Sequence, residues 1–197
     1  VLLKSPNGKQ TLKEWFSGIG LYIPENFGKH ILLGVVLGMV SLTGMLLGSV
    51  FTGKYVFSWS NLTAGHMIFS ITPGIWEEVL FRGVLFILFI SRFKSVVKAF
   101  WLQTVIFAVC HLASPSPEAI AELVSVFIIG LTFSITAYKT KALVAGIIYH
   151  YIHDAFLFLV QNPGGEYHGF SDNATFYIFL WMSMGVNVMI VFFFANS

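Results

Sequence analysis

Residues 68–90 read IFSITPGIWEEVLFRGVLFILFI, an apolar run that is long enough to cross a bilayer but carries three charges. The charged residues are Glu77, Glu78 and Arg82. A charge near the bilayer centre costs at least about 2.5–3.5 kcal/mol, so such a residue usually faces a protein interior or a water-filled cavity and has a function there. We therefore expect the chemistry of this protein in this segment.

The composition of the whole chain is that of a membrane protein. Of the 197 residues, 56% are hydrophobic and 10% are charged, whereas soluble domains carry about 25% charged residues. The net charge of +2 is small and not clustered, which gives no indication of nucleic-acid binding. The single cysteine, Cys110, excludes an intramolecular disulfide and a cysteine-based metal site.

The apolar segments predict an all-α, polytopic transmembrane helix bundle, because a span needs roughly 20 predominantly apolar residues and the runs do not alternate as barrel strands do. Residues 1–30 are expected to form an interfacial N-terminal segment before a transmembrane domain over residues 31–197. Pro73-Gly74 is expected to break the second span. Hydroxyls within the spans, such as that of Ser41, are expected to bond to carbonyls of their own helices. The six predicted spans are residues 31–52, 66–91, 96–112, 119–138, 142–161 and 174–195.

Basic residues are distributed unevenly over the predicted links. Four lysines precede the first span, and the links at 92–98 and 139–141 are basic, whereas the loops at 113–118 and 162–173 carry no Lys or Arg. The positive-inside rule then places the N-terminus and the two basic links in the cytoplasm. We expect a multi-pass integral membrane protein, in the cell membrane of a prokaryote or the endoplasmic reticulum of a eukaryote.

The three charges of the second span have different local surroundings. Glu78 and Arg82 are four residues apart, which places them on one helix face in the order that favours an ion pair. Glu77 is rotated about 100° from Glu78 and has no obvious local partner. One interpretation is a buried ion network that only holds helices together. The other gives Glu77 a chemical task and makes Glu78 and Arg82 its structural support.

Further polar residues occur in the third and fifth spans. His111 follows Phe107 by four residues at the end of the third span, and His150 and Asp154 share one face of the fifth. Judged alone, His111 is equally well explained as a helix-end residue, and Phe107 as core or lipid-facing packing. In the fifth span, His150, His153 and Asp154 lie within about one turn, and three polar residues so close together in a membrane helix indicate a wet pocket. His153 points to another face, and we interpret it as structural or interfacial.

Two chemical arrangements fit this set. In the first, Glu77 is a general base that activates water, and His111, with help from His150 or Asp154, donates to the developing oxyanion. In the second, two histidines and a carboxylate bind zinc, a known catalytic ligand set, although the chain lacks the His-Glu-x-x-His helix of the common metalloproteases. Cys110 is not expected to be a nucleophile. Its neighbour His111 would have to act as the base, but neighbours on a helix point about 100° apart.

The order Glu-Glu-x-x-x-Arg, Phe-x-x-x-His and His-x-x-x-Asp on successive spans resembles the CAAX prenyl endopeptidase and bacteriocin-processing family. This family includes the type II CAAX protease, or Ras-converting enzyme, and many abortive-infection-type membrane proteins. The resemblance covers about residues 66–158, including the short link at 138–142. It implies an all-α bundle with a catalytic cavity inside the membrane, and a glutamate protease that uses no metal and no other cofactor.

The resemblance also implies residue roles and partners. Its partners would be membrane lipid and a peptide or prenylated protein substrate, cleaved near the C-terminus of CAAX-type proteins. Asp154 stands where the prenyl proteases usually have Asn. The alternatives are a non-proteolytic binding, immunity or scaffold protein of the same fold, a zinc-dependent protease, and a proton-coupled transporter. The implied catalytic residues are Glu77, His111, His150 and Asp154, and the implied supporting residues are Glu78, Arg82 and Phe107.

Overall fold

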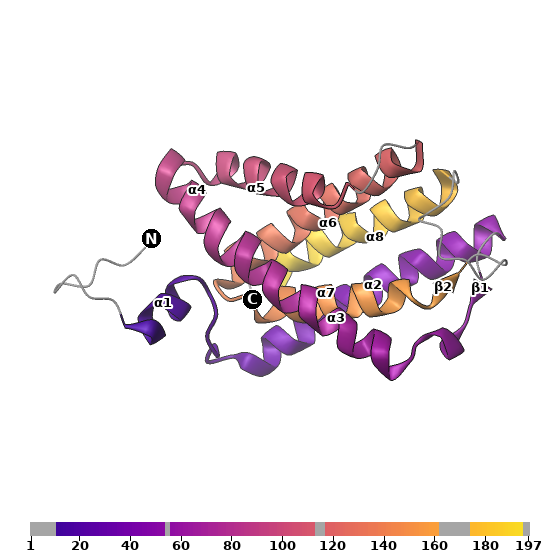
Figure 1. The fold of residues 1–197 in the computed structure, drawn as a ribbon, viewed down its shortest axis with the longest axis horizontal. Coiled ribbons are helices and arrows are strands. Elements are labelled where there is room, and N and C mark those ends of the chain that lie inside the picture. Colours follow the sequence, from indigo (N-terminus) through magenta and orange to yellow (C-terminus); the bar gives the residue numbers. More distant parts are fainter. Residues whose placement is uncertain (1–10, 54–55, 113–116, 162–173, 195–197) are drawn as a thin grey trace.

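The computed structural model describes residues 11–53, 56–112, 117–161 and 174–194. It confirms the predicted all-α bundle, whose long helices lie side by side along the long axis of the molecule (Figure 1). The helices in chain order are α1 (Leu12–Gly18), α2 (Phe27–Thr52), the 3-10 turn η1 (Trp59–Asn61), α3 (Ala64–Glu77), the π-helical segment η2 (Glu78–Leu85), α4 (Phe86–Phe93), α5 (Val96–Cys110), α6 (Pro117–Thr140), α7 (Val144–Leu157) and α8 (Ala174–Phe194).

Two short strands close one end of the bundle. Over the described residues, β1 (Val56–Phe57) and β2 (Val160–Gln161) form the only sheet, an antiparallel pair. Each strand has two residues, so the pair links the chain after α2 to the chain after α7 without adding a layer to the fold. The pair lies at the end opposite the turn between α4 and α5 (Figure 1).

Helix α2 packs against both α7 and α8. Two of its glycines, Gly34 and Gly38, lie four residues apart on the face toward α7. A Cβ on Gly34 would lie 2.7 Å from the carbonyl oxygen of Ala145, and one on Gly38 would lie 2.5 Å from Cγ2 of Ile152. Small residues at this spacing let membrane helices approach closely, so these glycines set the distance between α2 and α7.

A buried polar cluster joins the same three helices. The Asn187 amide nitrogen of α8 lies 3.0 Å from the Leu37 carbonyl oxygen of α2 and 2.9 Å from the Tyr149 hydroxyl of α7. The Ser41 hydroxyl lies 3.0 Å from the same Tyr149 oxygen. The expectation that Ser41 bonds to its own helix is thus wrong, because cross-helix partners are within reach of this buried hydroxyl. Thr43, which is exposed, does donate to a carbonyl of its own helix.

The predicted second span is one helical rod made of α3, η2 and α4. The expected break at Pro73-Gly74 is wrong, since α3 continues through Pro73 to Glu77. Gly74 packs closely on α7, where a Cβ would lie 3.3 Å from the Ile147 carbonyl oxygen, and this contact supports the helix beside the proline. The helix instead widens into π geometry from Glu78 onward. Such π segments occur frequently at functional sites.

Three helices within the described residues are long and apolar enough to cross a membrane by length and composition. The other predicted spans are shorter or interrupted: α5 has 15 residues, and α7 has 14 where the sequence predicted residues 142–161. Large apolar side chains such as Phe51, Phe69 and Phe193 are exposed on the outer surface, as expected for contact with lipid. The three long spans are Phe27–Thr52, Glu122–Thr140 and Thr175–Phe194.

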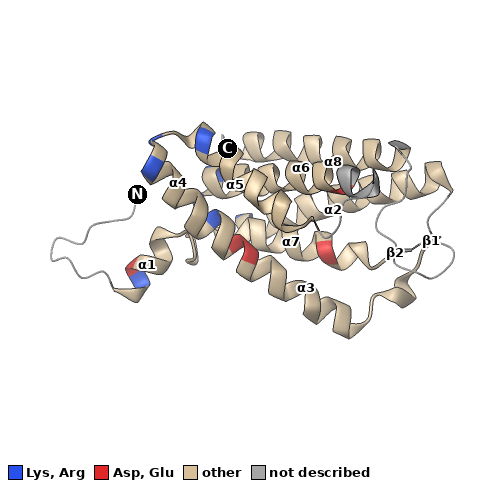
Figure 2. Ribbon diagram, turned by 45° about the horizontal axis from the view of Figure 1, so that its top comes forward, with Lys and Arg blue, Asp and Glu red and all other residues tan. Residues whose placement is uncertain are grey.

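Apart from Arg82, which pairs with Glu78, the charged residues of the bundle separate along its length. Lys and Arg residues occur where α4 turns into α5, and acidic residues lie nearer its middle on α3, η2 and α7 (Figure 2). Glu77 and Glu78 stand near the middle of the rod, with the 14 residues of α3 ending at Glu77 and 8 residues each in η2 and α4 after it. The cytoplasmic location of the basic end stays a prediction.

The N-terminal helix α1 begins with a capping box. The Glu14 backbone N–H donates to the Thr11 hydroxyl oxygen at 3.2 Å, and the Thr11 backbone N–H donates to the Glu14 carboxylate at 2.8 Å. The Thr11 hydroxyl also donates to the Glu14 carboxylate, at 3.0 Å, and the two hydrogen bonds that the carboxylate accepts from Thr11 lower its pKa. The interfacial location of residues 1–30 stays a prediction; residues 1–10 lie outside the described part, and α2 already begins at Phe27.

Candidate active site

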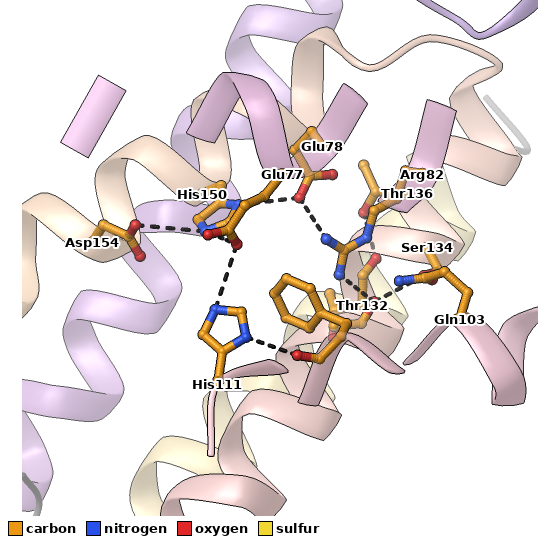
Figure 3. A network of polar contacts seen from close by, with 12 residues as sticks. Glu77, Glu78, Arg82, Gln103, His111, Thr132, Ser134, Thr136, His150 and Asp154 are labelled. Carbon is orange, nitrogen blue, oxygen red and sulfur yellow. Dashed lines mark hydrogen bonds and ion pairs between the residues drawn. The ribbon is translucent and has the colours of Figure 1, made fainter. Parts of the chain in front are cut away.

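The structure confirms the predicted pairing of Glu78 with Arg82. Nη1 of Arg82 donates to Oε1 of Glu78 at 3.0 Å, and both side chains are fully buried (Figure 3). Nη2 donates to the Gly130 carbonyl oxygen of α6 at 3.1 Å. A Cβ on Gly130 would lie 3.3 Å from this Nη2 and 2.7 Å from Cδ1 of Phe107. Glycine at this position therefore permits the close approach of α6 to the ion pair.

Three aromatic rings surround the Arg82 guanidinium. Its Cζ lies 4.0 Å from the ring centroid of Phe107, 5.0 Å from that of Phe133 and 5.8 Å from that of Phe81. Rings at these distances attract a cation and keep water away from it. Phe107, predicted as a supporting residue, thus contacts Arg82 directly. Phe133 of α6 was not foreseen, because one phenylalanine among the 21 in this chain gives no signal of its own.

His150 of α7 joins the ion pair to Glu77. Its Nδ1 lies 3.1 Å from Oε1 of Glu78, and an ionised carboxylate only accepts, so Nδ1 is the donor. Its Nε2 lies 3.7 Å from Oε2 of Glu77 and 3.5 Å from Oδ2 of Asp154. The ring also stacks on Phe133, with centroids 4.6 Å apart. These contacts fix the orientation of the imidazole.

His111 approaches Glu77 from another side. It is the residue that ends α5, and its Nδ1 donates to the Phe107 carbonyl oxygen at 2.7 Å. Its Nε2 lies 3.5 Å from Oε2 of Glu77, and its side chain is 33% exposed. Both His111 and His150 therefore direct Nε2 toward the same carboxylate oxygen (Figure 3).

That oxygen, Oε2 of Glu77, is buried and has no hydrogen-bond partner in the structure. Buried polar atoms are nearly always hydrogen-bonded, so an exception calls for an explanation. The two Nε2 atoms lie near it without forming hydrogen bonds to it. A carboxylate oxygen held in this way between two imidazoles is suited to accept a proton from a water molecule.

A cavity of about 130 Å³ lies beside these groups, between α5, α6, α7 and α8. His153 lines it, is 8% exposed and has an unpartnered Nδ1, so the interpretation of His153 as a residue pointing elsewhere is wrong. Glu122 of α6 also lines the cavity and was not among the predicted site residues. The predicted site residues among the lining are Phe107, His111, His150 and Asp154.

Neither zinc nor the thiol gains support from the geometry. In the part of the chain that the structure describes, no group of three or more His, Cys, Asp and Glu side chains is arranged to hold a metal ion. Cys110 is free and exposed at the end of α5. The residue of this helix end that lines the cavity is its neighbour His111.

Comparison with known proteins identifies a family for this chain. Residues 59–156 match the family described as Type II CAAX prenyl endopeptidase Rce1-like, close to the predicted core of residues 66–158. Neither the curated proteins nor the solved structures gave a match. The matched range contains all the predicted site residues, which are Glu77, Glu78, Arg82, Phe107, His111, His150 and Asp154. The chain is therefore a multi-pass integral membrane protein that belongs to the Rce1-like family of type II CAAX prenyl endopeptidases.

Proposed function

We propose that this protein is an intramembrane endopeptidase in which Glu77 activates the water that hydrolyses a peptide bond. The observation that carries the proposal is the unpartnered Oε2 of Glu77, with Nε2 of His111 at 3.5 Å and Nε2 of His150 at 3.7 Å. A water in a polar site needs two to four hydrogen-bonding partners, and these three groups supply them. A general base must reach its proton directly or through one water.

In the proposed reaction, Glu77 takes a proton from the water while the water oxygen bonds to the scissile carbonyl carbon. The carbonyl π electrons move to the carbonyl oxygen, which becomes an oxyanion and accepts a hydrogen bond from a protonated imidazole. Glu77 then delivers its proton to the amide nitrogen as the carbon–nitrogen bond breaks. The products are a carboxylic acid and an amine.

The two histidines have different tasks in this proposal. Because Nδ1 of each ring already donates, to Phe107 or to Glu78, Nε2 is the atom left to face the cavity. His111 is one-third exposed, which favours it as the donor to the oxyanion. His150 is buried between Glu78 and Asp154, which favours a role in positioning the water beside Glu77.

Glu78 and Arg82 are proposed to support Glu77 and to take no part in the proton transfers. Their charges neutralise each other at 3.0 Å inside a water-excluding ring cage. The backbone that carries this pair also carries Glu77, so the pair anchors the general base against α6 through the Gly130 carbonyl. A catalytic group needs neighbours that hold it in a fixed position in this way.

Prenylated CAAX-type proteins are the proposed substrate class. The description of the matched family names a CAAX prenyl endopeptidase. Helices α6, α7 and α8 also contribute apolar side chains to the cavity wall, which suits a hydrophobic or lipidated peptide. The apolar lining residues are Val126, Ile129, Leu157, Leu180 and Met184.

Cleavage of a farnesylated CAAX peptide by purified protein in nanodiscs tests the proposal. We expect wild-type protein to cleave it, and Glu77→Gln to lower the rate by about 10²–10⁴-fold, the usual range for a general base. Glu14→Gln makes the same carboxylate-to-amide change outside the membrane bundle and should leave the rate unchanged. An unprenylated copy of the peptide measures how much the prenyl group contributes.

Two outcomes would contradict the proposal in different ways. A near wild-type rate for Glu77→Gln would show that another group activates the nucleophile. Tight peptide binding without cleavage by the wild-type protein would favour the non-proteolytic binding or scaffold alternative.

A further inference from the structure

A second and larger cavity lies further along the bundle, toward the turn between α4 and α5. Its volume is about 360 Å³, within the range of about 300–1,000 Å³ that is typical of small-molecule sites. Helix α4 contributes Phe86, Ile87 and Ile90 to its wall, and α6 contributes Ala137 and Tyr138. Most of the wall is therefore apolar. The family assignment gives this cavity no function.

The N-terminal segment contributes residues 18–20 to the cavity wall. Ile19 is 3% exposed, and the Gly20 carbonyl oxygen accepts from the Leu143 backbone N–H at 2.9 Å. Gly83 of η2 meets this segment so closely that a Cβ on it would lie 3.1 Å from the Ile19 carbonyl oxygen. Gly20 itself has a φ of +84°, a conformation that favours glycine. The segment is thus a packed part of the bundle, and the cavity is a built site.

The buried side of the cavity contains an unused hydrogen-bond donor. Arg82 lines the cavity and is 1% exposed, and its Nε has no hydrogen-bond partner. Its other two nitrogens are already used, Nη1 by Glu78 and Nη2 by Gly130. A buried donor without an acceptor destabilises the folded protein. An acceptor oxygen that entered this cavity would remove that destabilisation.

The lining of the cavity also includes an exposed cation. Lys141 lines the cavity at the link between α6 and α7, with its ammonium 4.1 Å from the ring centroid of Tyr138. The nearby turn between α4 and α5 adds Arg92, Lys94 and Lys98 to this end of the bundle (Figure 2). The described lining includes no Asp or Glu. The site therefore combines an apolar wall, positive charge at its mouth and a donor at depth.

We propose that this cavity binds one acidic phospholipid. Its phosphate pairs with Lys141, an ester carbonyl oxygen accepts from Nε of Arg82, and the start of an acyl chain lies along Phe86, Ile87 and Ile90. Basic pockets between transmembrane helices are known to bind anionic headgroups. A zwitterionic lipid lacks the net charge that Lys141 and the basic turn attract, and a free anion lacks the chain that the apolar wall accepts.

Lipid retention by the purified protein tests this site without any cleavage assay, so its failure would leave the proposed protease function untouched. Detergent-solubilised protein is titrated with phosphatidylglycerol or phosphatidylcholine, and bound lipid is counted by native mass spectrometry. We expect one phosphatidylglycerol to be retained, with much weaker retention of phosphatidylcholine. Inorganic phosphate and a long-chain fatty acid, titrated separately, should not displace it at equal concentration.

Lys141→Asn removes the charge at the mouth, and Asn tolerates the positive φ of 59° found at this position. We expect about a fivefold loss of affinity for phosphatidylglycerol, since one lysine near an anionic lipid surface contributes about 1 kcal/mol. Lys139→Gln is the matched control, because Lys139 is two residues away, does not line the cavity and contacts the Phe192 ring instead. It should retain the lipid as wild type does.

Ile90→Trp places a larger side chain in the cavity and should abolish retention of the single lipid while leaving the melting temperature in phosphatidylcholine nearly unchanged. Equal retention of phosphatidylglycerol by wild type, Lys141→Asn and Ile90→Trp would overturn the proposal. Equal retention of the two phospholipids, or displacement by phosphate or by fatty acid alone, would overturn it as well.

Discussion

Glu77 and Glu78 are neighbours in the chain, yet their surroundings differ in kind. Glu78 is fully buried, with Arg82 at 3.0 Å and His150 at 3.1 Å from its Oε1. Glu77 is also buried, but among the described residues no Arg or Lys pairs with it, and its Oε2 faces the Nε2 atoms of His111 and His150 at 3.5 and 3.7 Å. Oε2 of each glutamate has no hydrogen-bond partner, so the two residues differ in the cation beside Glu78 and the two imidazoles beside Glu77. The comparison shows two ways to keep a carboxylate inside a membrane protein: pairing it with a cation, or placing it beside polar groups that can hold water.

Because of this difference, we expect Glu78 and Arg82 to matter mainly for stability, and Glu77 mainly for activity. A buried ion pair contributes little net stability when intact, but losing one partner costs about 3–5 kcal/mol because the other charge stays buried and unpaired. This applies to Glu78 and Arg82. Glu77 has no such partner to abandon, so its replacement should affect the reaction more than the fold.

The largest expected contrast is between Glu77→Gln and Glu78→Gln. We expect Glu77→Gln to lower the cleavage rate by about 10²–10⁴-fold with a nearly unchanged melting temperature. Glu78→Gln should lower the melting temperature clearly, because Arg82 loses its counter-charge. Cleavage kinetics and thermal unfolding of both variants in the same detergent provide the measurement. Equal losses of stability would show that the two glutamates form one structural network.

Arg82→Ala should destabilise the protein by about 3–5 kcal/mol, since it leaves the Glu78 carboxylate buried and unpaired and removes the cation from the rings of Phe107 and Phe133. Urea unfolding in mixed micelles measures the loss. Arg82→Lys, the control, keeps the charge but loses the two-pronged contact to Glu78 and Gly130, so an intermediate loss is expected. A stable but inactive Arg82→Ala protein would instead indicate direct substrate contact.

His111→Ala should reduce the cleavage rate by about 100- to 1000-fold, the typical effect of losing one oxyanion donor. Its effect on stability should be small, because the side chain is one-third exposed. Rates at saturating substrate separate this effect from weaker binding. His66→Ala is the control, because His66 lies near the start of α3 and does not line the site cavity.

Metal analysis of the same preparations distinguishes the roles of the histidines further. We expect no stoichiometric zinc and no effect of chelators on cleavage. Zinc at one ion per chain, with activity lost to a chelator and restored by metal, would replace the proposed mechanism with the metalloprotease alternative.

The smallest expected effect is that of Cys110→Ser. The thiol is exposed at the end of α5, and surface substitutions away from special features usually change stability by less than about 0.5 kcal/mol. Cleavage and melting temperature should both match those of wild type. Complete loss of activity in a folded Cys110→Ser protein would show that the thiol, and not Glu77, performs the chemistry.

The class of fold and the Glu78–Arg82 pair of the site follow from local sequence patterns. Long apolar runs predict helices in a membrane, and three charges in one of them indicate a buried polar cluster. The pairing of Glu78 with Arg82 was also predictable, because it depends only on the local spacing of four residues. Local periodicity carries this information wherever both partners lie on the same helix.

The other features of the site depend on how the helices pack against one another. His111 and His150 lie on different helices, and the sequence does not contain the packing that aims both Nε2 atoms at Glu77. Phe133 and Gly130 act on Arg82 through the approach of α6, which no local pattern encodes. Packing also kept α3 continuous through its proline, placed His153 in the cavity wall, and formed the second cavity beside Arg82. Each of these features depends on contacts between helices, and such contacts are properties of the assembled bundle.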